Sequence, residues 1–192
     1  AKKCIASWKK FCPDFEIREW NEDNCDYLAM PFMAEAYAAK KYAFVSDVMR
    51  LVVLEQYGGV YFDTDVEVAR DISPLLDDEG FIGFENDQFV NSGQVMAAVP
   101  HQPVVQAMIE EYKKLHFANA DGSLNAVGCP HLNSDVMERF GLVRNGQEQS
   151  FRLDYPFDRL GGYYPSRKKG SVQIYTLSLI HISEPTRPIS IS

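Results

Sequence analysis

The stretch that decides the fold runs from Phe44 to Glu67 and reads FVSDVMRLVVLEQYGGVYFDTDVE. Between positions 44 and 54 only Ser46, Asp47 and Arg50 are polar. At the helical rotation of about 100° per residue, these three fall on one arc about 100° wide, and apolar residues cover the rest of the helix. The pattern therefore predicts a mostly buried helix with one small polar face.

The helix is expected to end at Gly58 and Gly59, because glycine suits the left-handed conformation that often ends a helix. Residues 60–62 then predict a strand at the centre of a sheet, and the pleat places Asp63 and Asp65 on one side. Two carboxylates this close repel each other, and solvent or a bound cation normally relieves the repulsion. Oxygen ligands with open positions suit Mg²⁺ or Mn²⁺ shared with substrate phosphates.

A bare Asp-x-Asp is most often a pair of solvated turn residues, so its context decides its meaning. An EF-hand beginning at Asp63 is excluded, because Val68 and Pro74 would stand where the calcium loop needs Gly and Glu. The distinguishing feature is the immediate succession of a polar-faced helix, a Gly-Gly pair, an apolar strand and the two carboxylates.

The rest of the chain alternates predicted helices with short predicted strands. Helices are expected at residues 1–12, 31–41 and 100–117, and in a last one that is capped by Asn133 or Ser134 and ends near 140. Strands are expected at residues 15–20, 81–85, 90–99 and 172–175, and a surface loop at 153–170. This alternation predicts an α/β domain around one sheet.

Composition limits the possible functions. A chain of 192 residues with 46% apolar content suits one globular domain. The net charge of −8 argues against nucleic acid as the main partner. The four cysteines lack metal-type spacing, which favours reduced thiols in a cytoplasm. No apolar run is long enough to span a bilayer, so any membrane association is expected to be peripheral.

The central motif resembles the sugar-binding region of the DXD glycosyltransferases, which include bacterial capsule and lipopolysaccharide sugar transferases and yeast-type mannosyltransferases. The resemblance extends over about residues 1–176. The sequence in this range is similar to glycosyltransferase family 32. The matching positions are Ser46, Asp47, Arg50, Gly58, Gly59, Tyr61, Asp63 and Asp65. The resemblance implies a glycosyltransferase-A-type nucleotide-binding fold, with a mixed central sheet flanked by helices.

The resemblance also implies the roles of individual residues. The diphosphate of a nucleoside-diphosphate sugar would be bridged by Mn²⁺ or Mg²⁺, with Asp65 as the direct ligand. Asp63 would contact the ribose or bind the metal through water, and the two carboxylates are the expected catalytic pair. Donor contacts are implied for Trp20, Asp47, Arg50, Tyr61 and Asn91. Where relatives often carry Thr-Gly-Pro on the acceptor side of the pocket, this chain departs from the pattern and has Val127-Gly128-Cys129-Pro130.

Four of these residues have structural alternatives. Trp20 also suits a core or rim aromatic. Asp47 and Arg50 also suit a salt bridge one helical turn apart. Asn91 also suits an Asx turn beside Gly93.

The implied reaction moves a sugar to a glycan or lipid-linked saccharide acceptor, with retention at the anomeric carbon, in the synthesis of cell-surface polysaccharide. The expected setting is the bacterial cytoplasm, at most peripheral to the inner face of the membrane. One alternative is a haloacid-dehalogenase-type phosphatase, whose nucleophile would be Asp63 and whose acid–base would be Asp65. Glu67 disfavours it, because that class has Thr or Val there. A second alternative is an inactive fragment that only binds a sugar nucleotide.

Two expectations concern the ends of the chain. Relatives carry a strand before the segment that matches Ala1 and a His-rich closing segment after the one that matches Tyr175, so residues 1–176 are expected to be a catalytic domain truncated at both ends. Residues 177–187 read LSLIHISEPTR and resemble a translated sequencing adapter. We therefore expect residues 177–192 to be a non-native tail that does not pack on the domain.

Overall fold

The computed structural model describes residues 2–153 and 171–175. The helices within these ranges are α1 Lys2–Phe11, α2 Pro31–Ala38, α3 Tyr42–Tyr57, α4 Pro103–Lys113 and α5 Cys129–Glu138, with a 3₁₀ turn η1 at Ser73–Leu76. The strands are β1 Gly59–Phe62, β2 Gly80–Phe84, β3 Val90–Ala98, β4 Gln149–Arg152 and β5 Ser171–Tyr175. The expectations for residues 154–170 and 176–192, including the tail, lie outside the described residues.

The five strands form one mixed sheet in the order β1-β3-β2-β5-β4. The β2–β5 pair is parallel, and the other three pairs are antiparallel. The predicted α/β class with a mixed sheet flanked by helices is therefore confirmed. The position of β1 corrects one prediction, because this strand lies at the edge of the described sheet and not at its centre.

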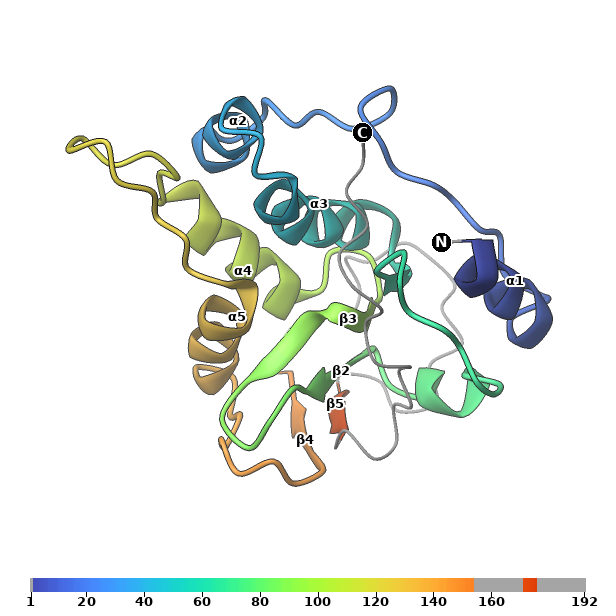
Figure 1. Cartoon of the computed structure of the whole chain (residues 1–192). Coiled ribbons are helices and arrows are strands. Elements are labelled where there is room, and N and C mark those ends of the chain that lie inside the picture. The colour runs from blue at the N-terminus through green and yellow to red at the C-terminus, as the bar shows by residue number, and fades with distance from the viewer. Residues whose placement is uncertain (1, 154–170, 176–192) are drawn as a thin grey trace.

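The two faces of the sheet pack against different helices. Met96 and Ala98 of β3 join the main core with α2, α3, α4 and α5, whereas Val95 and Ala97 face η1 on the other side. This division follows from the alternation of side chains along a strand. Figure 1 shows α2 to α5 gathered on one side of the molecule and α1 on the opposite side.

Helix α3 is the predicted buried helix with a polar face. Val48 and Leu51 are fully buried in the main core. Gly58 ends the helix with a φ of 64°, and its N–H bonds the Leu54 carbonyl at 2.9 Å. A Cβ at Gly58 would come within 2.6 Å of Pro100 Cδ, so this position needs glycine for its conformation and for space.

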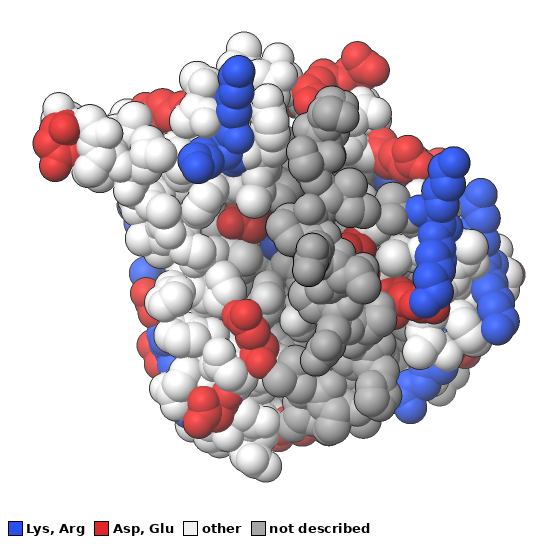
Figure 2. Space-filling view, in the orientation of Figure 1, with Lys and Arg blue, Asp and Glu red and all other residues white. Residues whose placement is uncertain are grey.

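Helix α1 lies on the far side of the sheet. Cys4 and Trp8 pack in a second cluster with Val68 and Ile72. The opposite face of α1 is basic, and Figure 2 shows blue side chains over it. The exposed lysines of α1 are Lys2, Lys3, Lys9 and Lys10. None of the described helices is both long and apolar enough to cross a bilayer.

The predicted strand at residues 15–20 is wrong. This segment is irregular, it forms no ladder with any described strand, and the Phe15 ring is 39% exposed. Alternating apolar residues predict a strand only where a neighbouring backbone can pair with it. Strand β4 was missed for the converse reason, since its residues QSFR show little apolar patterning and its pairing with β5 decides its conformation.

The predicted N-caps of the last helix are also wrong. Helix α5 begins earlier, after Gly128, with Pro130 in its first turn. Ser134 and Asn133 lie inside the helix and face β3. The Ser134 hydroxyl accepts a hydrogen bond from the Val90 N–H at 3.0 Å, and the Asn133 amide donates to Ser92 Oγ at 2.7 Å. These buried bonds join α5 to β3.

The packing of α3 gives a stability prediction. Leu51 is 0% exposed and Leu28 is 65% exposed. Leu51→Ala should lower the free energy of unfolding by about 2–5 kcal/mol, because it leaves a cavity in the main core. Leu28→Ala should change it by no more than about 0.5 kcal/mol. Urea unfolding of both variants measures this, and equal effects would contradict the assigned burial of α3.

Candidate active site

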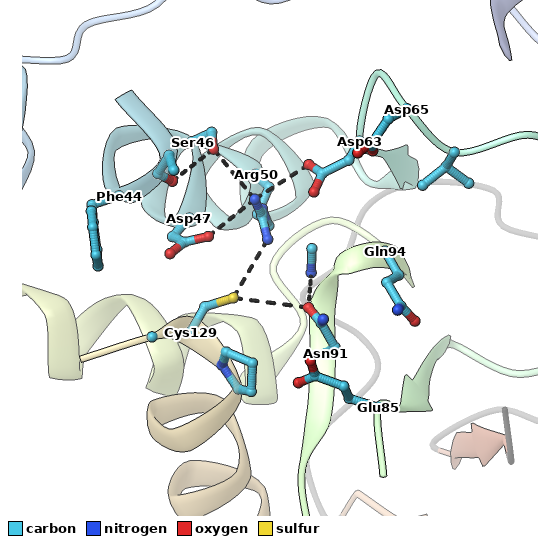
Figure 3. A pocket seen from close by; sticks show the side chains of 15 residues that line it. Phe44, Ser46, Asp47, Arg50, Asp63, Asp65, Glu85, Asn91, Gln94 and Cys129 are labelled. Atoms are coloured by element: carbon cyan, nitrogen blue, oxygen red, sulfur yellow. Dashed lines mark hydrogen bonds and ion pairs between the residues drawn. The ribbon is translucent and has the colours of Figure 1, made fainter. Parts of the chain in front are cut away.

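A cavity of about 440 Å³ lies where α3, the end of β1, the start of β3 and the start of α5 meet (Figure 3). Its size is within the range of small-molecule sites, about 300–1,000 Å³. The polar residues that line it are Ser46, Asp47, Arg50, Asp63, Asp65, Glu85, Asn91, Gln94 and Cys129. The structure thus brings together the polar face of α3, both predicted carboxylates and Asn91.

Arg50 is the cation at the centre of this cavity. Its side chain is 3% exposed, and Nη2 lies 3.1 Å from Asp47 Oδ1 and 3.3 Å from Asp63 Oδ1. Burying a guanidinium is costly unless carboxylates and hydrogen bonds compensate for the lost water. The salt bridge between Asp47 and Arg50 thus exists, and it extends through Arg50 to Asp63 (Figure 3).

Tyr61 fixes the same carboxylate from the strand. Its hydroxyl donates a hydrogen bond to Asp63 Oδ1 at 2.8 Å, and the Arg50 guanidinium lies over its ring at 5.1 Å from the centroid. Burial raises the pKa of the Tyr61 hydroxyl, which keeps it protonated as a donor. Both bonds reach Oδ1 of Asp63, and Oδ2 accepts none among the described residues.

Burial and the neighbouring Arg50 shift the pKa values of the Asp63 and Asp47 carboxyls in opposite directions. Burial raises the pKa of the Asp63 carboxyl, whereas Arg50 and the Tyr61 hydrogen bond lower it. The neighbouring charges of Asp65 and Asp47 raise it further. Burial likewise raises the pKa of Asp47, again against the effect of Arg50. An added cation beside Asp63 and Asp65 would relieve this repulsion.

Asp63 and Asp65 lie on a turn and not on a strand. Strand β1 ends at Phe62, and the Val66 N–H bonds the Asp63 carbonyl at 3.0 Å, which closes a turn over residues 63–66. The expectation that both side chains point to one side holds, because both line the cavity, but the turn causes this rather than the pleat. Asp65 is exposed, whereas Asp63 is partly buried.

The two carboxylates can hold a metal only together with other ligands. Within residues 2–153 and 171–175, no group of three or more His, Cys, Asp and Glu side chains could hold an ion. Mg²⁺ is commonly bound by one or two carboxylates plus substrate phosphates and water. The residues therefore fit an ion shared with a phosphate substrate, and they do not form a closed protein cage.

Asn91 forms the expected Asx turn and also lines the cavity. Its Oδ1 accepts the Gly93 N–H at 2.7 Å. Cys129 lies beside it: the thiol is 4.0 Å from Asn91 Oδ1, and Arg50 Nη1 donates to Cys129 Sγ at 3.6 Å. Burial raises the pKa of the Cys129 thiol to about 12, so the thiol stays protonated.

The structure does not bring Trp20 to this cavity. Its indole stacks on Tyr57 at the end of α3, with ring centroids 5.1 Å apart. The segment before it is irregular, so it does not place residue 20 at the end of a strand beside β1. The alternative of a rim aromatic describes Trp20 better than the donor contact does.

Sequence reasoning missed Glu85 and Gln94 as lining residues. Glu85 comes directly after the buried strand β2, as Asp63 comes directly after β1, and this parallel was the available signal. Gln94 interrupts the apolar strand β3. Cys129 stands where the family's acceptor-side segment was expected, but its contact with Arg50 needs the tertiary structure.

Comparison with known proteins found one matching family model and several relatives. Residues 1–82 match the family model described as "Glycosyltransferase sugar-binding region containing DXD motif". This matched region contains α3, β1 and the turn with both carboxylates. This match supports the DXD glycosyltransferase assignment that the resemblance implied.

The curated relatives come from different organisms. The chain is 28% identical over 116 residues to the mannosyl phosphorylinositol ceramide synthase CSH1 of Saccharomyces cerevisiae, covering 58% of this chain and 30% of that protein. It is 28% identical over 110 residues to the inositol phosphoceramide mannosyltransferase 1 of Schizosaccharomyces pombe, covering 54% and 31%. It is 31% identical over 75 residues to the human alpha-1,4-N-acetylglucosaminyltransferase, covering 39% and 20%. No solved structure matches.

Gly93 gives a prediction for the site. A Cβ there would lie 2.7 Å from Arg50 Nη1, 2.8 Å from Asn91 Oδ1 and 3.2 Å from Asp63 Oδ2. Gly93→Ala should therefore displace the Arg50–Asp63 pair and lower the free energy of unfolding by about 1–3 kcal/mol.

Gly128→Ala is the matched control, because Gly128 lines the same cavity and its Cβ would meet only Pro130 Cδ, at an ordinary 3.5 Å. Thermal or urea unfolding compares the two variants. A Gly93→Ala protein as stable as the Gly128→Ala protein would contradict the close packing of Arg50 against β3.

Proposed function

We propose that the chain is the donor-binding part of a glycosyltransferase that moves a sugar from a nucleoside-diphosphate sugar to a glycan or lipid-linked saccharide. The observation that supports this most is the cavity shared by Asp47, Arg50, Asp63 and Asp65 within the family's sugar-binding region. The chain spans about 30% of the length of the two yeast relatives. The activity of the whole protein is therefore part of the proposal.

A divalent cation, Mn²⁺ or Mg²⁺, belongs to this proposal. Asp65 would hold the ion directly, because its carboxylate is exposed on the turn at the cavity. Asp63 would offer its Oδ2 to the ion through water or to the ribose, since its Oδ1 already accepts hydrogen bonds from Arg50 and Tyr61. When bound, such an ion neutralises negative charge on the leaving diphosphate.

The protein's own residues bind and orient the donor. Arg50 and Tyr61 hold the Asp63 carboxylate in one orientation, which reduces the ordering needed when substrate arrives. Asn91 and Gln94 offer amide groups to sugar hydroxyls from β3, and Glu85 adds an acceptor on the same wall. The Gly128–Pro130 segment forms the side of the cavity assigned to the acceptor.

The relatives' names suggest which donors to test. Two of them are named as mannosyl-transferring enzymes and one as an N-acetylglucosaminyltransferase. We include transfer with retention at the anomeric carbon in the proposal as the family's stereochemistry. The cytoplasmic location and the bacterial source remain predictions. The names of the relatives give no support to the phosphatase alternative.

The test is ligand-dependent stabilisation. With Mn²⁺ present, GDP-mannose or UDP-N-acetylglucosamine should raise the melting temperature of the protein, and a chelator should abolish the rise. At a ligand concentration of about 100 times Kd, binding stabilises the fold by about 2.7 kcal/mol. Asp65→Asn should remove the metal-dependent part of the shift. If no sugar nucleotide in a panel of different bases and sugars stabilises the protein, donor binding is refuted.

Asp23→Asn is the matched control, because it makes the same change of charge at an exposed position in the turn at residues 22–24. It should keep the full metal-dependent shift. Hydrolysis of p-nitrophenyl phosphate tests the phosphatase alternative in the same preparation. Phosphate release that depends on Asp63, without any response to nucleotide sugars, would favour that alternative over sugar transfer.

A further inference from the structure

The turn that carries Asp63 and Asp65 is held from outside the cavity by helix α1. Trp8 contacts the chain on both sides of this turn. Its ring stacks on Phe62, directly before Asp63, with centroids 5.5 Å apart. Its indole N–H donates to the Val66 carbonyl, directly after Asp65, at 2.8 Å. One buried side chain thus fixes both ends of the four-residue turn.

Ser7 of α1 also bonds the chain just after this turn. The Val68 N–H donates to Ser7 Oγ at 2.9 Å, and the Ser7 hydroxyl in turn donates to the Cys4 carbonyl at 2.7 Å. In an extended chain the carbonyl of one residue and the N–H two residues later point to the same side. The side chains of α1 therefore satisfy the backbone of residues 66–68 as a neighbouring strand would.

This arrangement matters because the turn itself has few constraints. Strand β1 is at the edge of the described sheet and ends at Phe62, so no ladder continues past Asp63. Within the turn, the Val66 N–H to Asp63 carbonyl bond is the backbone hydrogen bond that closes it. Arg50 and Tyr61 hold the Asp63 side chain, but neither bonds Asp65.

We propose that Trp8, supported by Ser7, is a positioning residue that sets the place of the Asp65 carboxylate relative to Asp63. This inference rests on the proposed function in so far as Asp65 binds a metal shared with the donor. Trp8 packs in the cluster with Val68 and Ile72 and does not line the cavity that Asp63 and Asp65 line. It acts through the backbone at residues 62 and 66.

The first experiment needs no ligand. Trp8→Phe keeps an aromatic ring against Phe62 and removes the indole N–H, and Ser7→Ala removes the acceptor for Val68. Each variant should speed hydrogen–deuterium exchange in a peptide covering residues 59–70 by about fivefold, which corresponds to the loss of one hydrogen bond of typical strength. Exchange at the wild-type rate in both variants would overturn the proposal.

The second experiment measures the effect on the site. The concentration of Mn²⁺ that gives half-maximal binding of GDP-mannose or UDP-N-acetylglucosamine should rise by about fivefold or more in Trp8→Phe, in line with lost support of a metal ligand. Ile72→Val is the control, because it removes a methyl group from the same cluster around α1 and leaves both hydrogen bonds intact.

The outcomes separate the two proposals. If the wild type binds no nucleotide sugar with Mn²⁺, the proposed function fails, and hydrogen exchange alone decides whether Trp8 and Ser7 order the turn. If the wild type binds and Trp8→Phe needs no more Mn²⁺ than Ile72→Val, positioning by Trp8 is wrong. Trp20→Phe should behave as wild type in both experiments, since that indole stacks on Tyr57 away from the turn.

Discussion

The buried guanidinium of Arg50 is the interaction on which the site depends. It has a 3% exposed side chain and two carboxylate partners, Asp47 on its own helix and Asp63 after β1. A cation removed from water needs such partners, and the partners lose stability if the cation is removed. Arg50 therefore ties the position of α3 to the position of Asp63. The cavity forms at the point where these two elements meet.

The rest of the molecule supports this junction from two directions. On one side, α5 bonds β3 through Ser134 and Asn133, which places Cys129 and Pro130 on the cavity wall. On the other side, α1 bonds residues 66–68 and stacks on Phe62. The turn with the two carboxylates thus lies between the polar residues that line the cavity and the apolar cluster around α1.

Most of the local structure around the central motif was predictable from the sequence. The apolar pattern of residues 44–54 and the Gly-Gly pair give α3 and its end at Gly58, because helix periodicity and glycine conformation are local properties. The convergence of Asp47, Arg50, Asp63 and Asp65 was also predicted, since the motif places the polar face of the helix beside the end of the strand.

The errors arise where tertiary contacts decide the structure. Residues 15–20 alternate as a strand does, but they find no described backbone partner. Ser134 has the residue type of an N-cap, yet it bonds β3 from inside α5. The sequence pattern also cannot show that Ser7 and Trp8 bond residues about sixty positions away.

A double-mutant cycle between Arg50 and Asp63 tests the central interaction most directly. Arg50→Met should lower the free energy of unfolding by about 3–5 kcal/mol, because it leaves buried carboxylates without their cation. Asp63→Asn should recover part of that loss in the double variant, with an interaction energy of at least about 1 kcal/mol. Strictly additive effects of the two substitutions would contradict the view that Arg50 holds Asp63 in the site.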